Sequence, residues 1–255
     1  MDTNNSSNSE ALINRIIQNE LNQNIDLNQW AFNCIKESEG KNILELCSGI
    51  GRQTECLLQK FKNSHLTCVD ISEESLLKIK HSSFYKEEIM TLVCDGMDEF
   101  FSNNISTYDT IFVSYGLYYA KEIDTVLNKV YLSLKKGGNF IVLGPYGDNN
   151  KQLFHEVQKT GVEIDKYIIH TCSDFMYSVV INKMLGLFKS YTIDTVINEV
   201  KWNTIEDVLK YWRNTTFYDP NKCTDFLLNL KNHFLSNPNF INEKHIMLLQ
   251  CLNKL

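Results

Sequence analysis

The chain has 255 residues, 43% of them hydrophobic, with only 3 prolines and 11 glycines and a formal net charge of −6. This size and apolar content predict one large folded domain and exclude a disordered chain. The acidic balance, without a Lys/Arg block, argues against nucleic acid as a partner, because phosphate backbones need a concentrated basic surface.

The first 40 residues predict a short N-terminal region of helices. Residues 1–8 are polar and are expected to be disordered. Apolar residues recur at helical spacing over 9–23 and over 26–38, with Ser9 and Asp26 as caps. This region therefore precedes the main domain.

Residues 41–160 alternate between strand and helix five times. The predicted strands are 41–47, 65–70, 89–95, 108–114 and 137–145. The predicted helices are 51–61, 72–82, 96–101, 122–135 and 149–160. The strands are continuously apolar, as expected when both faces of a parallel sheet are buried. The pattern predicts an α/β fold with a doubly wound sheet.

Residues 161–255 do not continue the regular alternation of strand and helix. Helices are predicted over 173–188, 204–218 and 224–235, a β-rich segment over 190–202, and a final strand over 241–252. No Gly-, Pro- or Ser-rich linker separates this region, so we expect it to complete the same domain and sheet.

The eight cysteines form no C-x-x-C pair, and no histidine stands at zinc-ligand spacing. This indicates free thiols in a reducing compartment and no metal. The N-terminus does not resemble a signal peptide, and no apolar stretch reaches membrane-spanning length. We therefore expect a cytoplasmic protein without a membrane partner.

Ligands of doubly wound folds bind at the carboxyl ends of the strands. The first strand delivers Glu45 and a turn with Gly49 and Gly51, where glycine permits tight folding. Asp70 ends the second strand and could accept hydrogen bonds from both hydroxyls of a ribose. Asp95 could accept from an exocyclic amine. The fourth strand ends in Ser114, followed by Tyr115. An acid after a strand is usually a helix cap, but polar groups at all four strand ends together favour a ligand site.

The segment "ELCSGIG" resembles the D/E-x-G-x-G-x-G motif of class I S-adenosylmethionine-dependent methyltransferases, with Cys47 replacing the first glycine. "CVDIS", "CDGMDEF", "YDTIFVSYGLYY" and "LKKGGNFIVLGP" are similar to the later motifs of the small-molecule type 11 and type 25 members, from about residue 42 to 154. The resemblance implies a Rossmann-like seven-stranded sheet, mostly parallel with an antiparallel last strand, and a helical lid.

The same resemblance implies S-adenosylmethionine as cofactor and S-adenosylhomocysteine as product. The cofactor-binding residues that it implies are Glu45, Cys47, Ser48, Gly49, Gly51, Asp70, Ile71, Asp95, Gly96, Met97 and Ser114. A dinucleotide is disfavoured, because its pyrophosphate demands a third glycine where this chain has Thr54. An acid at Glu45 suits the ammonium of the methionine part better than a phosphate.

Methyl transfer from a sulfonium is an in-line displacement, so positioning and exclusion of water can supply most of the rate. A general base is needed only if the acceptor arrives protonated. We predict catalytic roles for Tyr115 and Tyr119, and substrate contacts for Tyr118 and Tyr146. The competing interpretation is that two of the three residues Tyr115, Tyr118 and Tyr119 simply pack.

The segment from about residue 162 to 218 is the expected lid over the acceptor. Trp212 and Arg213 are its candidate substrate contacts, and an arginine there could bind a carboxylate bidentately. Aromatic residues at helical spacing more often belong to a core, and a surface salt bridge is the alternative for the arginine.

Three hypotheses stay open. The leading one is a methyltransferase acting on an O, N or C nucleophile of a small metabolite, as a monomer or homodimer. "GPYGDNN" and residues 196–216 also resemble the malonyl-carrier-protein methyltransferase of biotin synthesis, which favours a carboxyl acceptor on a carrier protein. The third is a catalytically silent, methyltransferase-like binding subunit.

Overall fold

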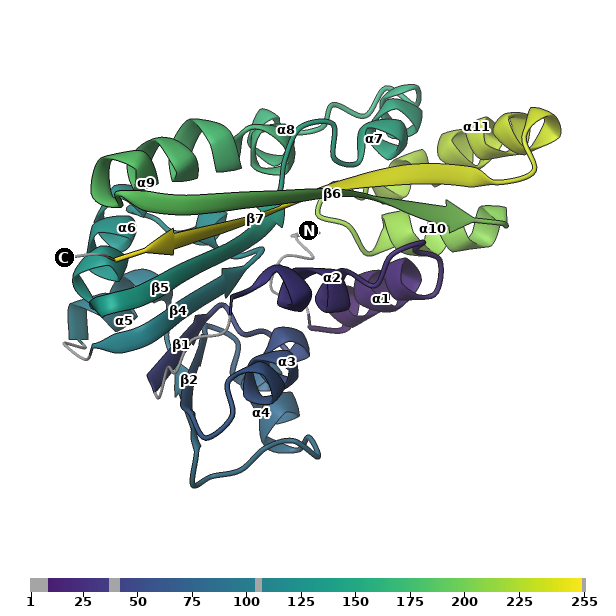
Figure 1. Cartoon of the computed structure of the whole chain (residues 1–255). Coiled ribbons are helices and arrows are strands. Elements are labelled where there is room, and N and C mark those ends of the chain that lie inside the picture. The colour runs from purple at the N-terminus through teal and green to yellow at the C-terminus, as the bar shows by residue number, and fades with distance from the viewer. Residues whose placement is uncertain (1–8, 37–41, 104–106, 254–255) are drawn as a thin grey trace. The chain divides into compact units, whose positions relative to one another are not determined.

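The computed structural model describes residues 9–36, 42–103 and 107–253, so the expectation for residues 1–8 lies outside the described residues. Seven strands form one sheet in the order β3-β2-β1-β4-β5-β7-β6 (Figure 1). The strands are β1 Asn42–Leu46, β2 His65–Asp70, β3 Met90–Cys94, β4 Tyr108–Ser114, β5 Leu134–Pro145, β6 Ser190–Trp202 and β7 Phe240–Leu252.

The α-helices agree with most of the predicted ranges to within a few residues. They are α1 Ser9–Glu20, α2 Leu27–Cys34, α3 Arg52–Lys60, α4 Glu73–Lys80, α5 Met97–Asn103, α6 Ile123–Leu132, α7 Lys151–Gln158, α8 Lys166–Ser173, α9 Asn182–Leu187, α10 Ile205–Arg213 and α11 Cys223–Ser236. Short turns of other helix types cover η1 Leu117–Tyr119, η2 Met176–Ile181 and η3 Pro220–Lys222. Within the described ranges, no helix combines the length and apolar character needed to span a membrane.

The sheet contains both parallel and antiparallel strand pairs, as predicted. Strands β3, β2, β1, β4 and β5 pair in parallel, whereas β7 is antiparallel to both β5 and β6. Backbone bonds from Asn253 to Gly138 and from Tyr146 to His245 follow the antiparallel register of β5 and β7. The predicted α/β class, with an antiparallel last strand, is therefore confirmed.

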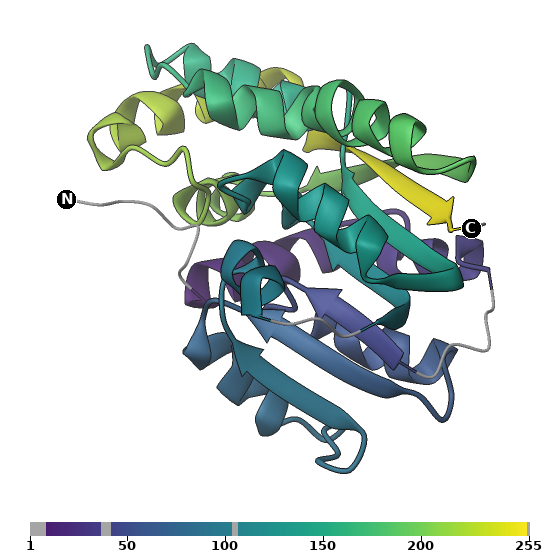
Figure 2. The ribbon, with the colours of Figure 1, turned by 90° about the vertical axis from the view of Figure 1, so that its left-hand side faces the viewer.

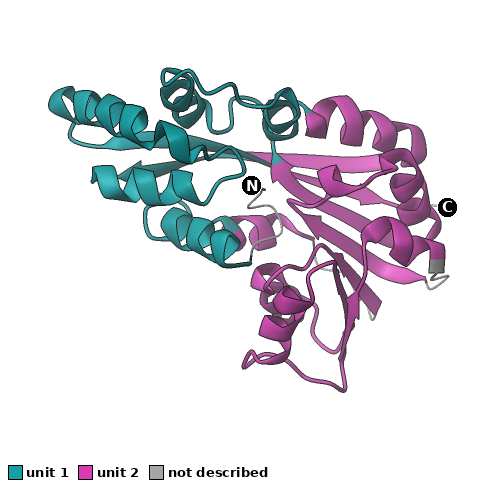
Figure 3. Cartoon of the chain, turned by 180° about the vertical axis from the view of Figure 1, so that it is seen from behind, with its two compact units in different colours: residues 1–27, 145–174, 196–246 teal, residues 28–144, 175–195, 247–255 magenta. Residues whose placement is uncertain are grey.

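The chain divides into two compact units (Figure 3). Unit 1 comprises residues 1–27, 145–174 and 196–246, and unit 2 comprises residues 28–144, 175–195 and 247–255. The boundary passes through β6 and β7, so each of these strands contributes residues to both units.

Unit 2 contains the parallel strands, which lie side by side in Figure 2. Right-handed crossovers place α3 and α4 on one face of these strands and α5 and α6 on the other. Leu44 of β1 and Phe112 of β4 are fully buried, as their apolar runs predicted. Helix α4 begins after Ser72, whose side chain accepts a hydrogen bond from the Ser75 backbone N–H.

Unit 1 has a separate aromatic core. Trp202, Trp212 and Phe226 are fully buried in it, and Phe240 of β7 is nearly so. Helix α10 begins at the predicted position, because the Thr204 side chain accepts a hydrogen bond from the Asp207 backbone N–H.

The helix predicted over 173–188 was wrong as a continuous α-helix. Helix α8 ends at Ser173, a π-helix follows over Met176–Ile181, and α9 begins only at Asn182. The Asp174 backbone N–H closes α8 onto the His170 carbonyl, which ends that helix inside the apolar pattern. Apolar periodicity did not distinguish these helical pieces from one another.

Candidate functional site

The turn after β1 has an unusual backbone. Gly49 and Gly51 have positive φ angles of 52° and 86°, and Cys47 has a φ of 55°. A Cβ atom at Gly51 would lie 2.9 Å from Ile79 Cγ1 and 2.9 Å from Phe84 Cζ. Glycine is thus required at position 51 both for its conformation and for its close packing at the start of α3.

Asp70 connects this turn to the neighbouring strand ends. Its carboxylate accepts the Gly49 backbone N–H at 2.7 Å and the Ser72 backbone N–H at 2.9 Å. Its carbonyl accepts the Asp95 backbone N–H at 3.1 Å, which brings in the end of β3. A carboxylate has about four lone-pair sites, so Asp70 retains capacity for the hydroxyls of a ligand.

Glu45 is a buried carboxyl within β1, with 2% of its surface exposed. Thr54 Oγ1 donates to Glu45 Oε2 at 2.6 Å, and the Cys68 thiol lies 3.7 Å from the same oxygen. Burial raises the pKa of Glu45 to about 8, although both of these hydrogen bonds act to lower it. The carboxyl is therefore mostly protonated near neutral pH, and a cation beside it would favour its ionised form.

Thr54 is the residue at this site that the sequence reasoning missed. The sequence interpretation treated it only as a missing glycine. In the structure it is fully buried and supplies the hydroxyl donor to Glu45. The sequence signal for this role was a polar residue in the first turn of the helix that follows the glycine turn, at a position that faces back toward β1.

Cys47 packs against the end of β4. A Cβ atom added at Gly116 would lie 2.5 Å from Cys47 Cβ and 2.6 Å from its Sγ. Burial raises the pKa of the Cys47 thiol to about 12, and the charges of Asp70 and Glu45 add to this rise. A thiol that stays protonated is a poor nucleophile, so the geometry favours a space-filling role.

Tyr115, directly after β4, also has a left-handed backbone, with a φ of 52°. Its backbone N–H donates to the Leu143 carbonyl of β5 at 2.8 Å. The neighbouring strands β1 and β4 therefore both lead into a non-glycine residue with positive φ, Cys47 and Tyr115. Such strained residues concentrate at functional sites.

Two buried hydroxyls in these turns fit a polar ligand. Within the described part of the chain, the Ser48 and Ser114 Oγ atoms are buried without a hydrogen-bond partner. Met97 is buried after β3, whereas the Ile71 side chain is 73% exposed. Unsatisfied hydroxyls, a Gly-rich turn and two carboxyls suit a nucleoside that carries an ammonium and a carboxylate.

The tyrosines after β4 differ in their surroundings. The Tyr118 ring lies 4.7 Å from the Tyr119 ring and 6.0 Å from the Phe175 ring, between centroids. Tyr119 is 52% exposed. Tyr118 thus has packing contacts on two sides, and Tyr119 is the more exposed of the two residues.

The other predicted substrate contacts belong to unit 1. Trp212 is fully buried, with ring centroids 4.3 Å from Phe226 and 4.9 Å from Tyr218. This burial gives Trp212 a packing role and argues against the predicted substrate contact. Arg213 forms an ion pair with Glu206 at 3.2 Å. The Tyr146 ring lies 5.6 Å from the ring of His245 on β7, between centroids.

Comparisons with known proteins agree on one fold. The model of the ubiE/COQ5 methyltransferase family matches residues 9–159. The YcgJ protein from Bacillus subtilis is 12% identical, with a TM-score of 0.59 over 89% of this chain and 98% of that chain. BH2331 from Bacillus halodurans is 10% identical, with a TM-score of 0.60 over 90% and 99%.

A third solved structure is that of the plantazolicin methyltransferase BpumL with a desmethylplantazolicin analogue and S-adenosylhomocysteine. It is 13% identical, with a TM-score of 0.52 over 98% of this chain and 90% of that chain. A comparison with curated proteins gives no match.

Proposed function

The chain belongs to the ubiE/COQ5 methyltransferase family and uses S-adenosylmethionine as methyl donor, and from this premise we propose that it methylates an O, N or C nucleophile of a small-molecule metabolite. The acidic net charge of −6 supports a small acceptor over a nucleic acid. The bound cofactor supplies an activated methyl group, and the protein supplies orientation and exclusion of water.

We assign the cofactor to the turns of unit 2. Asp70 binds the ribose, Glu45 faces the methionine ammonium, and Asp95 and Met97 receive the adenine. The remaining contacts come from Cys47, Ser48, Gly49, Gly51, Ile71, Gly96 and Ser114. The observation that carries this assignment is Asp70, whose carboxylate already holds the turns after β1 and β2 together.

For the acceptor we propose Tyr115 and Tyr119 as the groups that orient the nucleophile, with Tyr118 beside them. The acceptor contacts expected of Tyr146 and Arg213 stay predictions from the sequence. A hydroxyl that orients a nucleophile acts in the transition state, so it affects turnover more than cofactor affinity.

Calorimetric titration with S-adenosylhomocysteine and with NAD tests the cofactor assignment. We expect binding of the first and none of the second. Asp70→Asn should weaken binding of S-adenosylhomocysteine, while Glu88→Asn, on the exposed turn before β3, should leave it unchanged. Equal affinity of parent and Asp70→Asn would refute the role of Asp70.

Isotope-labelled cofactor with a metabolite extract tests the acceptor class. Transfer of label to a small molecule supports the proposal. Label in a base-labile ester on a carrier protein would favour the carboxyl alternative. Cofactor binding with no transfer to any acceptor would favour a silent binding subunit.

A further inference from the structure

Glu45 is buried among the cofactor turns of unit 2 without a cation beside it. Within the described residues it takes part in no ion pair, and the charge that acts on it, that of Asp70, is also negative. Its hydrogen bonds from Thr54 and Cys68 both reach Oε2, so Oε1 is the oxygen left for a ligand. A buried carboxyl without a cation is favoured as the neutral acid, and a cationic group on a ligand would be the partner that it lacks.

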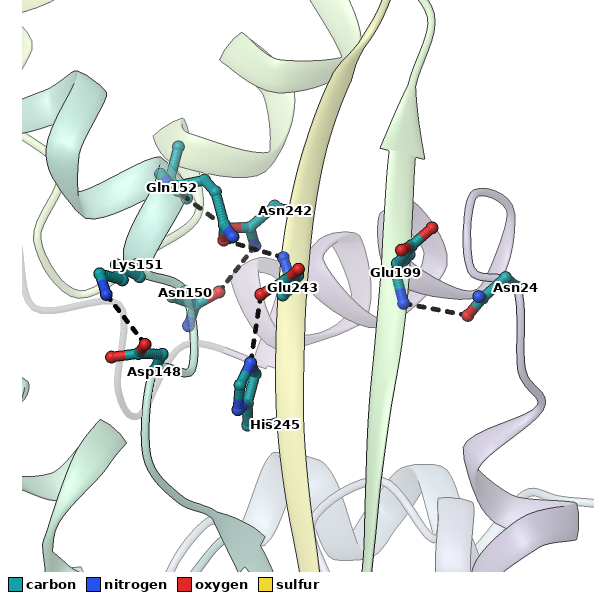
Figure 4. A network of polar contacts seen from close by, with 10 residues as sticks. Asn24, Asp148, Asn150, Lys151, Gln152, Glu199, Asn242, Glu243 and His245 are labelled. Carbon is teal, nitrogen blue, oxygen red and sulfur yellow. Dashed lines mark hydrogen bonds and ion pairs between the residues drawn. The ribbon is translucent and has the colours of Figure 1, made fainter.

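Carboxylates elsewhere in the chain have such a partner within the protein. In unit 1, Asp148 pairs with Lys151 at 2.9 Å. Glu243 Oε2 lies 3.2 Å from His245 Nε2, and Figure 4 shows both pairs. The hydrogen bond from His245 is the main cause that lowers the pKa of Glu243, whereas burial raises the pKa of Glu45 to about 8. Glu45 therefore holds a proton under conditions in which these other carboxyls are ionised.

Helix α3 places a hydroxyl against the Glu45 carboxyl. Thr54 and Leu57 are three residues apart, so they share one face of the helix, and both are fully buried. The charged residues Arg52 and Glu55 of the same helix are exposed. Thr54 Oγ1 lies 2.6 Å from Glu45 Oε2, a distance typical of a well-formed hydrogen bond between oxygens. Because a β-branched side chain is stiff at χ1, the packing of α3 holds this hydroxyl in place.

A hydroxyl can serve the Glu45 carboxyl in both of its ionisation states. It accepts a hydrogen bond from the neutral acid or donates one to the carboxylate. The bond to the carboxylate is charge-assisted and about twice as strong as a neutral one. Thr54 therefore lowers the cost of ionising Glu45 but does not hold it ionised, as a lysine or arginine at that position would.

The other groups around Glu45 do not replace this hydroxyl. Burial raises the pKa of the Cys68 thiol on β2 well above its ordinary value and raises the pKa of the Cys47 thiol to about 12, so both thiols are neutral. The Cys68 thiol lies at the longer distance of 3.7 Å. Asp70 acts against ionisation of Glu45. On the other side of β1, the register partner of Glu45 is the uncharged Phe112 of β4.

We propose that Thr54 is the positioning residue through which Glu45 recognises the ammonium of the cofactor, and that this pair makes the site selective for nucleosides that carry an amino-acid group. This inference rests on the proposed function and on its assignment of Glu45 to the methionine ammonium. As the ligand binds, the carboxyl proton of Glu45 passes to solvent, the carboxylate pairs with the ammonium, and the Thr54 hydroxyl donates to the carboxylate. A nucleoside without an ammonium gains nothing from this ionisation.

Calorimetric titration with S-adenosylhomocysteine compares the parent with Thr54→Val, Thr54→Ser and the control Thr110→Val. Valine keeps the shape of threonine without its hydroxyl, and serine keeps the hydroxyl. Thr110 of β4 is a matched control, because it is fully buried and its hydroxyl has no hydrogen-bond partner within the described part of the chain. We expect Thr54→Val to bind about 10-fold more weakly near neutral pH, because the lost bond is charge-assisted in the complex. Thr54→Ser and Thr110→Val should bind like the parent.

The pH dependence of binding separates a positioning role of Thr54 from a packing role. Below the pKa of the free Glu45 carboxyl, binding must release a proton, so the affinity of the parent should rise about 10-fold between about pH 6 and about pH 7. The loss in Thr54→Val should shrink from about 10-fold at about pH 6 to about 3-fold at about pH 8.5, because the free carboxyl then begins to ionise in both proteins. A loss of the same size at every pH would overturn the positioning role.

A second probe, 5′-methylthioadenosine, has the nucleoside and the thioether but no ammonium. We expect the parent and Thr54→Val to bind it equally, with no change in affinity over the same pH range. Equal weakening of both ligands in Thr54→Val would assign Thr54 to packing beneath the nucleoside and would overturn its role in ammonium recognition.

A measurement on the parent alone tests the same step if the variants fail to fold. Infrared difference spectra should show that S-adenosylhomocysteine removes a protonated carboxyl band near neutral pH, and a band that persists in the complex would overturn the proposal. Failure of the proposed function gives a different result, since a parent that binds no S-adenosylhomocysteine contradicts the cofactor assignment itself. A parent that binds it, with affinity and pH profile unchanged in Thr54→Val, contradicts only the role of Thr54.

Discussion

The buried carboxyl of Glu45 predicts a specific pH dependence of stability. Its pKa is raised from an ordinary value of 4.5 to about 8 by burial. Between these two values the folded protein holds a proton that the unfolded chain has lost. Unfolding therefore releases this proton, and the free energy of unfolding contributed by Glu45 falls as pH rises through that window.

The magnitude follows from the width of the window. One pH unit inside it corresponds to about 1.4 kcal/mol. From about pH 5 to about pH 7, Glu45 should thus lower the free energy of unfolding by roughly 2–3 kcal/mol. That is a large share of the stability of an ordinary domain, for which about 5–15 kcal/mol is typical.

The assay compares the parent with Glu45→Gln. Glutamine keeps the volume and an oxygen that can accept from Thr54, but it does not titrate. Urea unfolding at several pH values in this range gives the free energy for each protein. All other titratable groups are the same in the two proteins, so the difference between their free energies of unfolding reports Glu45 alone. As pH rises, this difference should change against the parent by about 1.4 kcal/mol per pH unit.

Glu87→Gln, on an exposed turn, serves as the control and should follow the parent at every pH. Parallel curves for the parent and Glu45→Gln would refute the reasoning. That result would mean that the Glu45 carboxyl is ionised in the folded protein across the whole range.

Four other predictions follow from the same site. If the cofactor's ammonium ionises the buried carboxyl, binding near neutral pH should release up to about one proton, measurable by calorimetry in buffers of different ionisation enthalpy. Gly116→Ala should destabilise the fold by about 1–3 kcal/mol through its contact with Cys47, and Cys47→Gly should suppress that loss in a double-mutant cycle. Gly186→Ala, with open space around it, is the control. Asp70→Ala should weaken binding of S-adenosylhomocysteine by roughly 2–4 kcal/mol, and unchanged affinity would mean that another group holds the ribose. Tyr119→Phe should lower turnover with little change in cofactor affinity, and turnover at the parent rate would leave Tyr119 as a packing residue.

Local signals in the sequence were sufficient for the α/β class. Short, continuously apolar strands alternate with amphipathic helices, and the helices that follow Ser72 and Thr204 begin within one residue of their predicted starts. These features depend on neighbours within a few residues, so no knowledge of distant contacts was needed. The positions of Asp70 and Glu45 at strand ends followed from the same pattern.

Tertiary structure decided which side chains meet. The Thr54 hydroxyl reaches Glu45 only because α3 folds back over β1. The aromatic spacing around Trp212 favoured a core over a lid surface, and only the tertiary structure shows that its ring packs against Phe226.

The pairing of Glu243 with His245 had a local signal, an acid and a histidine two residues apart in a strand. The residue that faces Nδ1 of His245 is Gly147, almost a hundred positions earlier in the chain. Periodicity records which face a residue occupies, but the partner on that face is set by the register between β7 and the loop after β5, and that register is fixed only when the sheet assembles.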